Sequence, residues 1–289
     1  MNEISQMDAD GLPRFSWHQM RAYWENHSKL WSDIDFIRDP DGLSNVCHAG
    51  EALWVNAYYA RFQRRVYRSL LATVPRPEAD ARALDVGCGA GRWCRLLQAQ
   101  GFRTVGIDLQ AELLEENRRR IPDVQFVRSS IQEYRDESHF DLISSVTVLQ
   151  HLPSVEQAAA VAKLRELTKT GGFVVALENI EDQGRHVFAN SIESWQELFQ
   201  SHSFRVVSLR RYDYSPFSRS VSALRRAKRL WVQSLPKADL AHERRTKWLG
   251  IRDGLTWIGV TLDSPIEALL VHYNVPLPSV HCGFLFVAV

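Results

Sequence analysis

The sequence has few cysteines and no long apolar run. Its four cysteines are Cys47, Cys88, Cys94 and Cys282, and no C-x-x-C pair occurs, so neither a zinc ribbon nor a thioredoxin-like redox motif is indicated. So low a count is typical of a reducing compartment. No apolar run could span a bilayer, and the first residues are acidic where a signal peptide is basic. We expect a cytoplasmic protein without a metal site.

An excess of charge of one sign is also lacking. The 289 residues carry a formal net charge of +1, so the chain as a whole is not an electrostatic binder of nucleic acid. Hydrophobic residues make up 45% and charged residues 24%, which is the balance of a globular protein with a large core. The length favours one enzyme-sized α/β domain with helical additions.

The middle of the chain alternates short apolar runs with helical stretches. Helices are expected at 92–100, 111–120, 155–170 and 192–202, and a longer one precedes them at 51–71. Strands are expected at 83–86, 103–109, 124–129, 140–149, 171–180, 204–213 and 281–289. Strands that alternate with helices of this length predict right-handed βαβ units and a mostly parallel sheet.

A glycine-rich turn follows the first of these strands. It reads Asp85-Val86-Gly87-Cys88-Gly89-Ala90-Gly91, and Arg92 stands where a dinucleotide fingerprint would have its third glycine. Asp85 would repel a diphosphate at this strand end, whereas it would suit a ligand with an ammonium and a sulfonium group. S-adenosylmethionine has both groups and no phosphate. The turn therefore favours S-adenosylmethionine over a nicotinamide dinucleotide.

A second carboxylate stands at the end of the next strand. Asp108 closes the run TVGIDL, one helix and one strand after the glycine turn. A carboxylate in this place can accept hydrogen bonds from both hydroxyls of a ribose. Either acid alone is as well explained as a helix cap or a solvated turn. The two together, placed around one glycine turn, indicate a nucleoside ligand.

These segments carry a family resemblance. ALDVGCGAGRW, GIDLQ, FVRSSIQEY, FDLISSVTVLQHLP and GGFVVALEN, in this order, resemble the class I S-adenosylmethionine-dependent methyltransferases of small-molecule type. The resemblance covers about residues 80–213 and the last strand. It implies a seven-stranded, mostly parallel, Rossmann-like sheet whose last strand, 281–289, is antiparallel.

The resemblance also implies which residues hold the cofactor. Asp85 and the turn residues Gly87, Cys88, Gly89 and Gly91 would hold its methionine end, and Asp108 its ribose. The loop after the third strand would hold the adenine, with Ser129-Ser130-Ile131 where many members have Asp or Asn. Leu109 and Ile131 would enclose the adenine ring, and Val146 would contact the cofactor from the end of the fourth strand.

The acceptor of the methyl group is less readable. Methyl transfer from a sulfonium needs mainly proximity, orientation and a dry site, and often a base. The Asn/Asp-Pro-Pro-aromatic motif of nucleobase amine methylation is absent after the fourth strand, and no Pro-Cys nucleophile or metal-ligand cluster is present. His151 and His281 are the candidate bases, although packing and local hydrogen bonding are the stronger explanation for each.

The N-terminal region, residues 1–78, is rich in aromatic residues and is interpreted as a helical lid. Most of its aromatic side chains are expected to pack the long helix against the sheet. Trp54 and Tyr59 are the two that we expect to reach the cofactor and exclude water from it.

The last strand is preceded by about 67 residues, and the minimal fold does not require these residues. We assign 214–280 as a helical insertion that forms the acceptor site. Residues 205–252 contain thirteen Lys or Arg against three Asp or Glu, a local charge of +10. Within it, 219–231 has the pattern of a basic amphipathic helix, which suits an anionic membrane surface or simply a solvated helix.

Residues 79–213 with 281–289 are therefore predicted to form the Rossmann-like cofactor-binding core. We expect a methyltransferase that acts on a small molecule, a secondary metabolite or a sugar-containing intermediate, at oxygen. An RNA methyltransferase, an enzyme for a lipid-linked acceptor and a non-catalytic S-adenosylmethionine-binding protein remain as alternatives. The basic insertion favours the first two of these.

Overall fold

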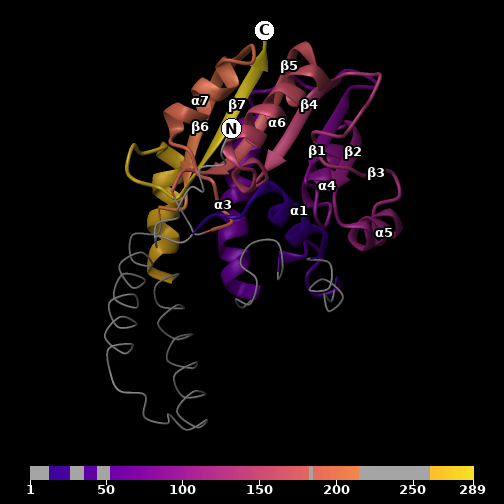
Figure 1. Ribbon diagram of the computed structural model, residues 1–289. Helices are drawn as coiled ribbons and strands as arrows, with labels where there is room; N and C mark the ends of the chain where they lie inside the picture. The colour runs from indigo at the N-terminus through magenta and orange to yellow at the C-terminus, as the bar shows by residue number, and fades with distance from the viewer. Residues whose placement is uncertain (1–12, 27–35, 44–52, 182–184, 215–260) are drawn as a thin grey trace.

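A seven-stranded sheet with helices on both faces forms the centre of the molecule in the computed structural model (Figure 1). The structure describes residues 13–26, 36–43, 53–181, 185–214 and 261–289. Its strands are β1 (Arg82–Val86), β2 (Arg103–Asp108), β3 (Gln125–Arg128), β4 (Phe140–Val146), β5 (Thr168–Asn179), β6 (Phe204–Tyr212) and β7 (His281–Ala288). Its helices are α1 (Trp17–Asn26), α3 (Leu53–Leu71), α4 (Arg92–Ala99), α5 (Ala111–Arg120), α6 (Ser154–Leu167) and α7 (Ile192–Gln200), with a 3₁₀ turn, η2, at Leu149–His151.

The strand order is β3-β2-β1-β4-β5-β7-β6. The five strands from β3 to β5 are parallel, and β7 lies antiparallel to both of its neighbours, β5 and β6. The predicted fold class, a mostly parallel sheet with an antiparallel last strand, is confirmed. Because β1 lies between β2 and β4, the chain crosses over after β3, and a ligand site is expected where the connections diverge at the carboxyl ends.

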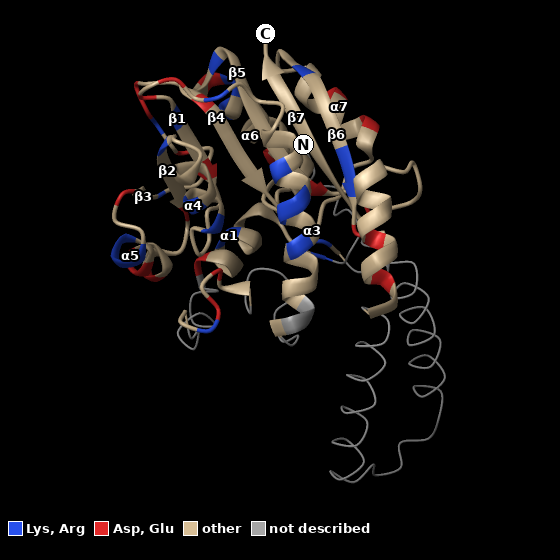
Figure 2. Cartoon of the chain, turned by 180° about the vertical axis from the view of Figure 1, so that it is seen from behind, with Lys and Arg blue, Asp and Glu red and all other residues tan. Residues whose placement is uncertain are grey.

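The apolar side chains divide into two layers, one on each face of the sheet. Helices α6 and α7 bury Leu164, Trp195 and Phe199 against one face. On the other face, Tyr67 of α3 stacks on Trp93 of α4, with ring centroids 4.3 Å apart. The helices thus cover the sheet on both sides, as Figures 1 and 2 show from opposite directions. This coverage leaves the carboxyl ends of the strands as the place for a site.

Two boundaries differ from the sequence-based expectation. The helix expected at 155–170 ends at Leu167, and β5 begins already at Thr168. Gly171 has φ 78°, and a Cβ on Gly172 would lie 2.9 Å from the carbonyl oxygen of Lys169. The two glycines therefore serve a tight bend inside the strand, where β4 also shifts register between Phe140 and Leu142, and do not end the helix.

Only part of the predicted insertion belongs to the described residues. Residues 261–273 are helical, and their buried Glu267 accepts the backbone N–H groups of Asp213 and Tyr214 at 2.6 and 2.9 Å. The predicted amphipathic helix at 219–231 lies outside the described residues. Within these, no helix combines the length and the apolar character that crossing a bilayer requires.

Candidate functional site

The glycine turn between β1 and α4 adopts the backbone that only glycine takes readily. Gly87, Gly89 and Gly91 have φ of 62°, 50° and 73°. A Cβ on Gly87 would lie 2.5 Å from Val148, and one on Gly91 would lie 2.5 Å from Ile121, whereas a Cβ on Gly89 would meet nothing within 4 Å. Gly89 is thus the glycine with open space before it. Gly87 and Gly91 thus permit close packing of neighbouring side chains, and Gly89 leaves open space beside the turn.

This difference gives a matched pair of variants. Gly91→Ala should lower the free energy of unfolding by about 2–4 kcal/mol, because left-handed backbone strain and overpacking against Ile121 add. Gly89→Ala meets only the backbone strain and should cost about 1–2 kcal/mol. Urea unfolding of both variants measures the difference. Equal losses of stability would contradict the assignment of the open side to Gly89.

Asp108, at the end of β2, is tied to the same turn. Its Oδ2 accepts the N–H of Gly89 at 2.9 Å, and its Oδ1 accepts the N–H of Gln110 at 3.1 Å. Burial raises the pKa of this carboxyl, against the effect of the backbone N–H groups of Gly89 and Gln110. Each carboxylate oxygen has a second lone pair, so the group can still accept two hydrogen bonds from a ligand.

A cavity opens beside Asp108 at the carboxyl ends of β1, β2 and β4. Nine of the predicted site residues line it: Gly87, Gly89, Asp108, Leu109, Ser129, Ser130, Ile131, Val146 and His151. Others had not been predicted there: Trp17, Trp24, Val86, Ile107, Gln110, Gln132, Thr147, Val148 and Leu152. The structure brings together the end of the first strand, the end of the second and the loop after the third, as the sequence had suggested.

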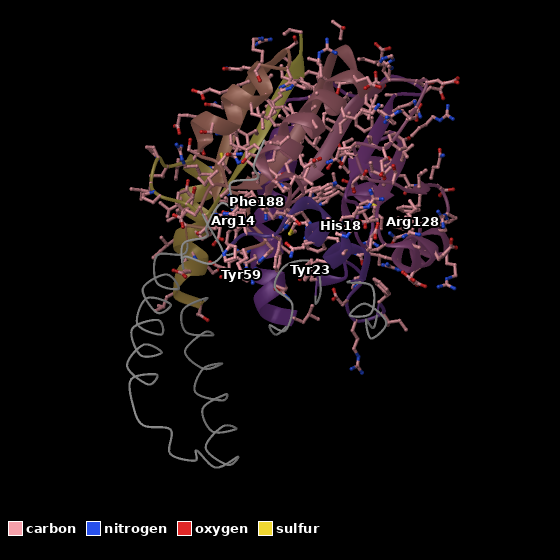
Figure 3. The ribbon with its side chains drawn as sticks, in the orientation of Figure 1. Arg14, His18, Tyr23, Tyr59, Arg128 and Phe188 are labelled. Carbon is pink, nitrogen blue, oxygen red and sulfur yellow. The ribbon has the colours of Figure 1, made fainter. Side chains whose placement is uncertain are left out.

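Five of the other predicted residues are described and do not line this cavity: Asp85, Cys88, Gly91, Tyr59 and His281. Cys88 is packed into a small apolar cluster. Tyr59 is half-buried on α3 and in ring contact with Tyr58. In Figure 3 it lies well apart from Arg128, the last residue of β3, which directly precedes the cavity residue Ser129. His281 lies two strands away from the cavity, at the start of β7. The side chain of Trp54 lies outside the described residues.

Asp85 is buried because residues alternate along a strand. Val86 faces the cavity, so its neighbour faces the opposite layer, where Oδ2 of Asp85 accepts the Cys94 thiol at 3.2 Å. Its Oδ1 is buried without a hydrogen-bond partner of good geometry. Burial raises the pKa of Asp85 to about 7, while Cys94, Ser144 and Arg92 favour the charged form. Such a carboxyl has room for one more donor.

Helix α1 closes the cavity from outside, a role that we had expected of Trp54 and Tyr59. Trp17 and Trp24, two turns apart on α1, line the cavity. Arg21 forms ion pairs with Glu133 at 2.6 Å and with Glu25 at 2.9 Å. Glu133 belongs to the loop after β3, so this contact joins the helix to the cavity rim. The aromatic composition pointed to the region, but nothing in the sequence singled out these two tryptophans.

Gln132 presents an amide oxygen at the same rim. Its Nε2 donates to Glu156 at 3.2 Å, which fixes the orientation of the amide, and its Oε1 is buried with no hydrogen-bond partner. Ser130, in contrast, uses its hydroxyl oxygen to accept the N–H of Glu133 at 3.2 Å. Gln132 is therefore the available acceptor for an amino group in this loop. Only its position after the third strand could have pointed to it in the sequence.

Two further buried side chains hold the backbone around the cavity. Asn117 of α5 donates from Nδ2 to the carbonyl of Gly89 at 2.6 Å. Glu178, at the end of β5, accepts the N–H groups of Leu149 at 3.2 Å and of Gln150 at 3.0 Å. Burial raises the pKa of Glu178 to about 8, although these N–H groups favour its charged form. Neither residue was predicted from the sequence.

The turn that Glu178 holds is strained. Thr147 has φ 57°, a conformation that β-branched residues rarely adopt, and it lines the cavity. Its N–H donates to the carbonyl of Leu177 at 2.7 Å. Strain of this kind persists where the surroundings enforce it and is frequent at functional sites. The β4 end is thus shaped by its neighbour β5.

His151 follows this turn and lines the cavity as expected. Its Nδ1 lies 2.8 Å from the carbonyl oxygen of His186, which can only accept, so Nδ1 carries the proton. The ring contacts Trp24 at 4.9 Å and is stacked on His186 at 5.7 Å between centroids. Burial lowers the pKa of His151 to about 4. The imidazole is neutral at pH 7 and is a weak base there.

The methyltransferase domain family matches residues 59–212. These residues include the glycine turn, Asp108 and six of the seven strands. The chain belongs to this family of methyltransferases. The class I, S-adenosylmethionine-dependent resemblance inferred from the motifs is thereby confirmed.

Several curated relatives share this part of the chain. A trans-aconitate 2-methyltransferase of Azoarcus sp. is 32% identical over 130 residues, which is 43% of this chain and 50% of the relative. One of Methylobacterium nodulans is 35% identical over 136 residues, 45% of this chain and 52% of the relative. This chain thus spans about half the length of these relatives. The crystal structure of the 1,6-didemethyltoxoflavin-N1-methyltransferase of Burkholderia thailandensis matches 69% of this chain and 84% of its own, with 20% identity and a TM-score of 0.48.

S-adenosylmethionine is the cofactor of the family, and the cavity fits it. Asp108 offers two acceptors for ribose hydroxyls. Ile107, Leu109 and Ile131 form an apolar wall that suits an adenine ring. No lysine or arginine is among the described residues that line the cavity, so these residues offer no cation to a diphosphate. Among the described residues, no three His, Cys, Asp or Glu side chains gather as a metal site would require.

Proposed function

We propose that this protein transfers the methyl group of S-adenosylmethionine to an oxygen of a small molecule. The observation that supports it most is the pairing of Asp108 with Gly89. A carboxylate with two spare lone pairs lies beside a glycine that leaves open space, in a cavity to which the described residues contribute no lysine or arginine. Such a site suits a nucleoside that bears a cationic methyl donor, which supplies an activated methyl group when bound.

The chain's own residues would position the donor and exclude water. Asp108 would accept the ribose hydroxyls, and the pinned amide of Gln132 would accept the adenine amino group. Trp17 and Trp24 would cover the cofactor from α1, which makes residues 1–78 a lid in part. Orientation in a dry site supplies much of the rate enhancement for such a displacement.

The acceptor is proposed to bind over the ends of β4, β5 and β7, beside the cofactor cavity. The helix at 261–273 would close this space, since its Glu267 anchors it to the end of β6. The relatives are named for methylation of trans-aconitate, a small tricarboxylate. Their shared region supports a small acceptor that is methylated at oxygen.

The test is a methyl-transfer assay with labelled S-adenosylmethionine, run together with calorimetric titration by S-adenosylhomocysteine. Binding of S-adenosylhomocysteine and labelling of a small hydroxyl- or carboxyl-bearing acceptor are expected. Labelling of total RNA alone, with a steep loss of binding in salt, would indicate a nucleic-acid acceptor instead. Binding of NAD without any binding of S-adenosylhomocysteine would overturn the proposal.

A further inference from the structure

His281 forms a pair with a carboxylate at the acceptor side of the sheet. It is the first residue of β7, in register with Asn179 of β5 and with Tyr212 of β6. Its Nδ1 lies 3.1 Å from Oδ2 of Asp213, and its ring is stacked on Tyr212 with centroids 5.1 Å apart. The pair lies at the carboxyl edge, two strands from the β4 end that lines the cofactor cavity.

The hydrogen bond decides which nitrogen of His281 is free to accept a proton. An ionised carboxylate only accepts, so Nδ1 of the neutral ring carries the hydrogen and Nε2 keeps its lone pair. No described residue hydrogen-bonds Nε2. The His281 side chain is 15% exposed, so part of the ring is accessible. His281 therefore keeps an unprotonated nitrogen at the carboxyl end of the parallel strands.

Asp213 is held in place from two sides. Its φ is 62°, in the left-handed region that Asp and Asn tolerate better than other side chains. Its N–H donates to Glu267, and its carbonyl accepts the N–H of Val280 at 3.0 Å. The backbone that carries the carboxylate is thus fixed by the helix at 261–273 and by the segment that enters β7. A fixed carboxylate fixes the ring that it binds.

The distance to the donor suits one small molecule. Neighbouring strands lie about 4.8 Å apart, so His281 on β7 is roughly 10 Å from the end of β4 across β5. That separation is the length of a small acceptor placed between the donor and the base. His151, by contrast, lines the cofactor cavity itself, and its lowered pKa makes it a weak base.

We propose that Asp213 and His281 form a dyad that takes a proton from the acceptor, and that the acceptor therefore presents a hydroxyl group. The inference rests on the proposed function. A carboxylic acid is already ionised at neutral pH and needs no base, whereas a hydroxyl must lose its proton as the bond to carbon forms. A base held by a carboxylate is the arrangement that the second case requires.

The hydroxyl oxygen bonds to the methyl carbon while the bond from this carbon to the sulfonium sulfur breaks, and the C–S electron pair stays on sulfur as a neutral thioether. The hydroxyl proton passes to Nε2 of His281. The resulting imidazolium is stabilised by the Asp213 carboxylate, to which it remains hydrogen-bonded. Asp213 is a positioning residue, and His281 is the catalytic one.

The pairing is tested first without any acceptor. The imidazole nitrogen chemical shifts of His281, assigned with His281→Asn, are measured at about pH 8, above the ordinary pKa of histidine. The proposal predicts a protonated Nδ1 and an unprotonated Nε2 in the native protein, and a changed tautomer balance in Asp213→Asn. A ring protonated at Nε2 in the native protein would overturn the dyad.

The substrate class is tested with two probes, the phenol 4-methylumbelliferone and trans-aconitate. The dyad predicts methylation of the phenol and a fall in kcat of about 100-fold in His281→Asn and in Asp213→Asn, with little change in KM. His202→Asn, in the turn between α7 and β6, is the matched control and should keep the native rate. Methylation of trans-aconitate at equal rates by the native protein and by His281→Asn would overturn the dyad but leave the proposed function intact.

Calorimetry with S-adenosylhomocysteine separates the two ways of failing. If it binds with equal affinity to the native protein and to both dyad variants, any loss of rate belongs to the acceptor step. If it binds to none of them, the proposed function itself fails. Should neither probe be methylated, the tautomer of His281 decides for or against the dyad.

Discussion

Replacing Asp108 with alanine should weaken binding of S-adenosylhomocysteine by about 1–3 kcal/mol. The variant removes the proposed acceptor of two ribose hydroxyl hydrogen bonds, and bonds to a charged group are among the stronger ones. It also removes the acceptor that holds the N–H of Gly89 at 2.9 Å, so the glycine turn loses a support. Calorimetric titration of the native and variant proteins measures the loss directly.

Two controls separate the carboxylate from its surroundings. Asp108→Asn keeps one carbonyl acceptor and should lie between the alanine variant and the native protein in affinity. Asp123→Ala removes an exposed aspartate between α5 and β3 that does not line the cavity. It should leave the affinity unchanged. An unaltered affinity in Asp108→Ala would show that the ribose binds elsewhere.

Replacing Glu178 with alanine should lower the free energy of unfolding by about 3–5 kcal/mol. The variant leaves the N–H groups of Leu149 and Gln150 without their acceptor inside the protein, and it opens a cavity at a fully buried position. Since the same turn carries Thr147 and His151, the cavity wall should loosen as well. Urea unfolding at constant pH provides the measurement.

The free energy of unfolding should also depend on pH through the Glu178 carboxyl. The pKa of Glu178 is raised to about 8 from an ordinary 4.5, so the folded protein holds this proton more tightly than the unfolded chain does. Stability from this group is fully present below about pH 4.5 and is lost as pH rises towards 8, at up to about 1.4 kcal/mol per pH unit. Glu178→Gln cannot titrate and should lack this part of the slope. The control Glu112→Gln, at an exposed position of α5, should keep the pH slope of the native protein. If the unfolding free energies of Glu178→Gln and of the native protein change with pH in parallel, the slope does not come from Glu178.

The sheet was predictable because its signals are local. Each strand is a short apolar run and each helix a periodic one, so their alternation defined the parallel part of the sheet. The bounds at Leu167 and Thr168 could not be predicted, because the glycines that resemble a helix stop serve a bend that depends on Asp141 in β4. That contact joins residues far apart in the sequence.

The cofactor side of the site was predictable where one turn and its neighbouring strand ends supply the residues. Gly89, Asp108 and Ile131 all follow strands, and parallel strands bring their carboxyl ends together. Whether a residue faces the ligand or the layer behind it was harder to predict. Asp85 precedes the glycines as the motif requires, yet it faces Cys94, behind the turn.

The supporting residues left no local trace. Asn117 and Glu178 look like ordinary polar residues in a helix and at a strand end, and only the fold brings them to the backbone that they hold. Trp17 and Trp24 belong to a helix whose place over the cavity depends on an ion pair with a distant loop. Asp213 stands beside His281 because β6 and β7 pair, 68 residues apart in the chain.

The position of β7 has a consequence for how the protein is made. This strand follows all the others in the chain, yet it lies between β5 and β6. Until the ribosome has released it, both of these strands present an open edge of unpaired backbone groups, which is a template for aggregation. The same delay leaves Asp213 without its histidine, so the growing polypeptide can assemble the cofactor half of the sheet well before the acceptor half is complete.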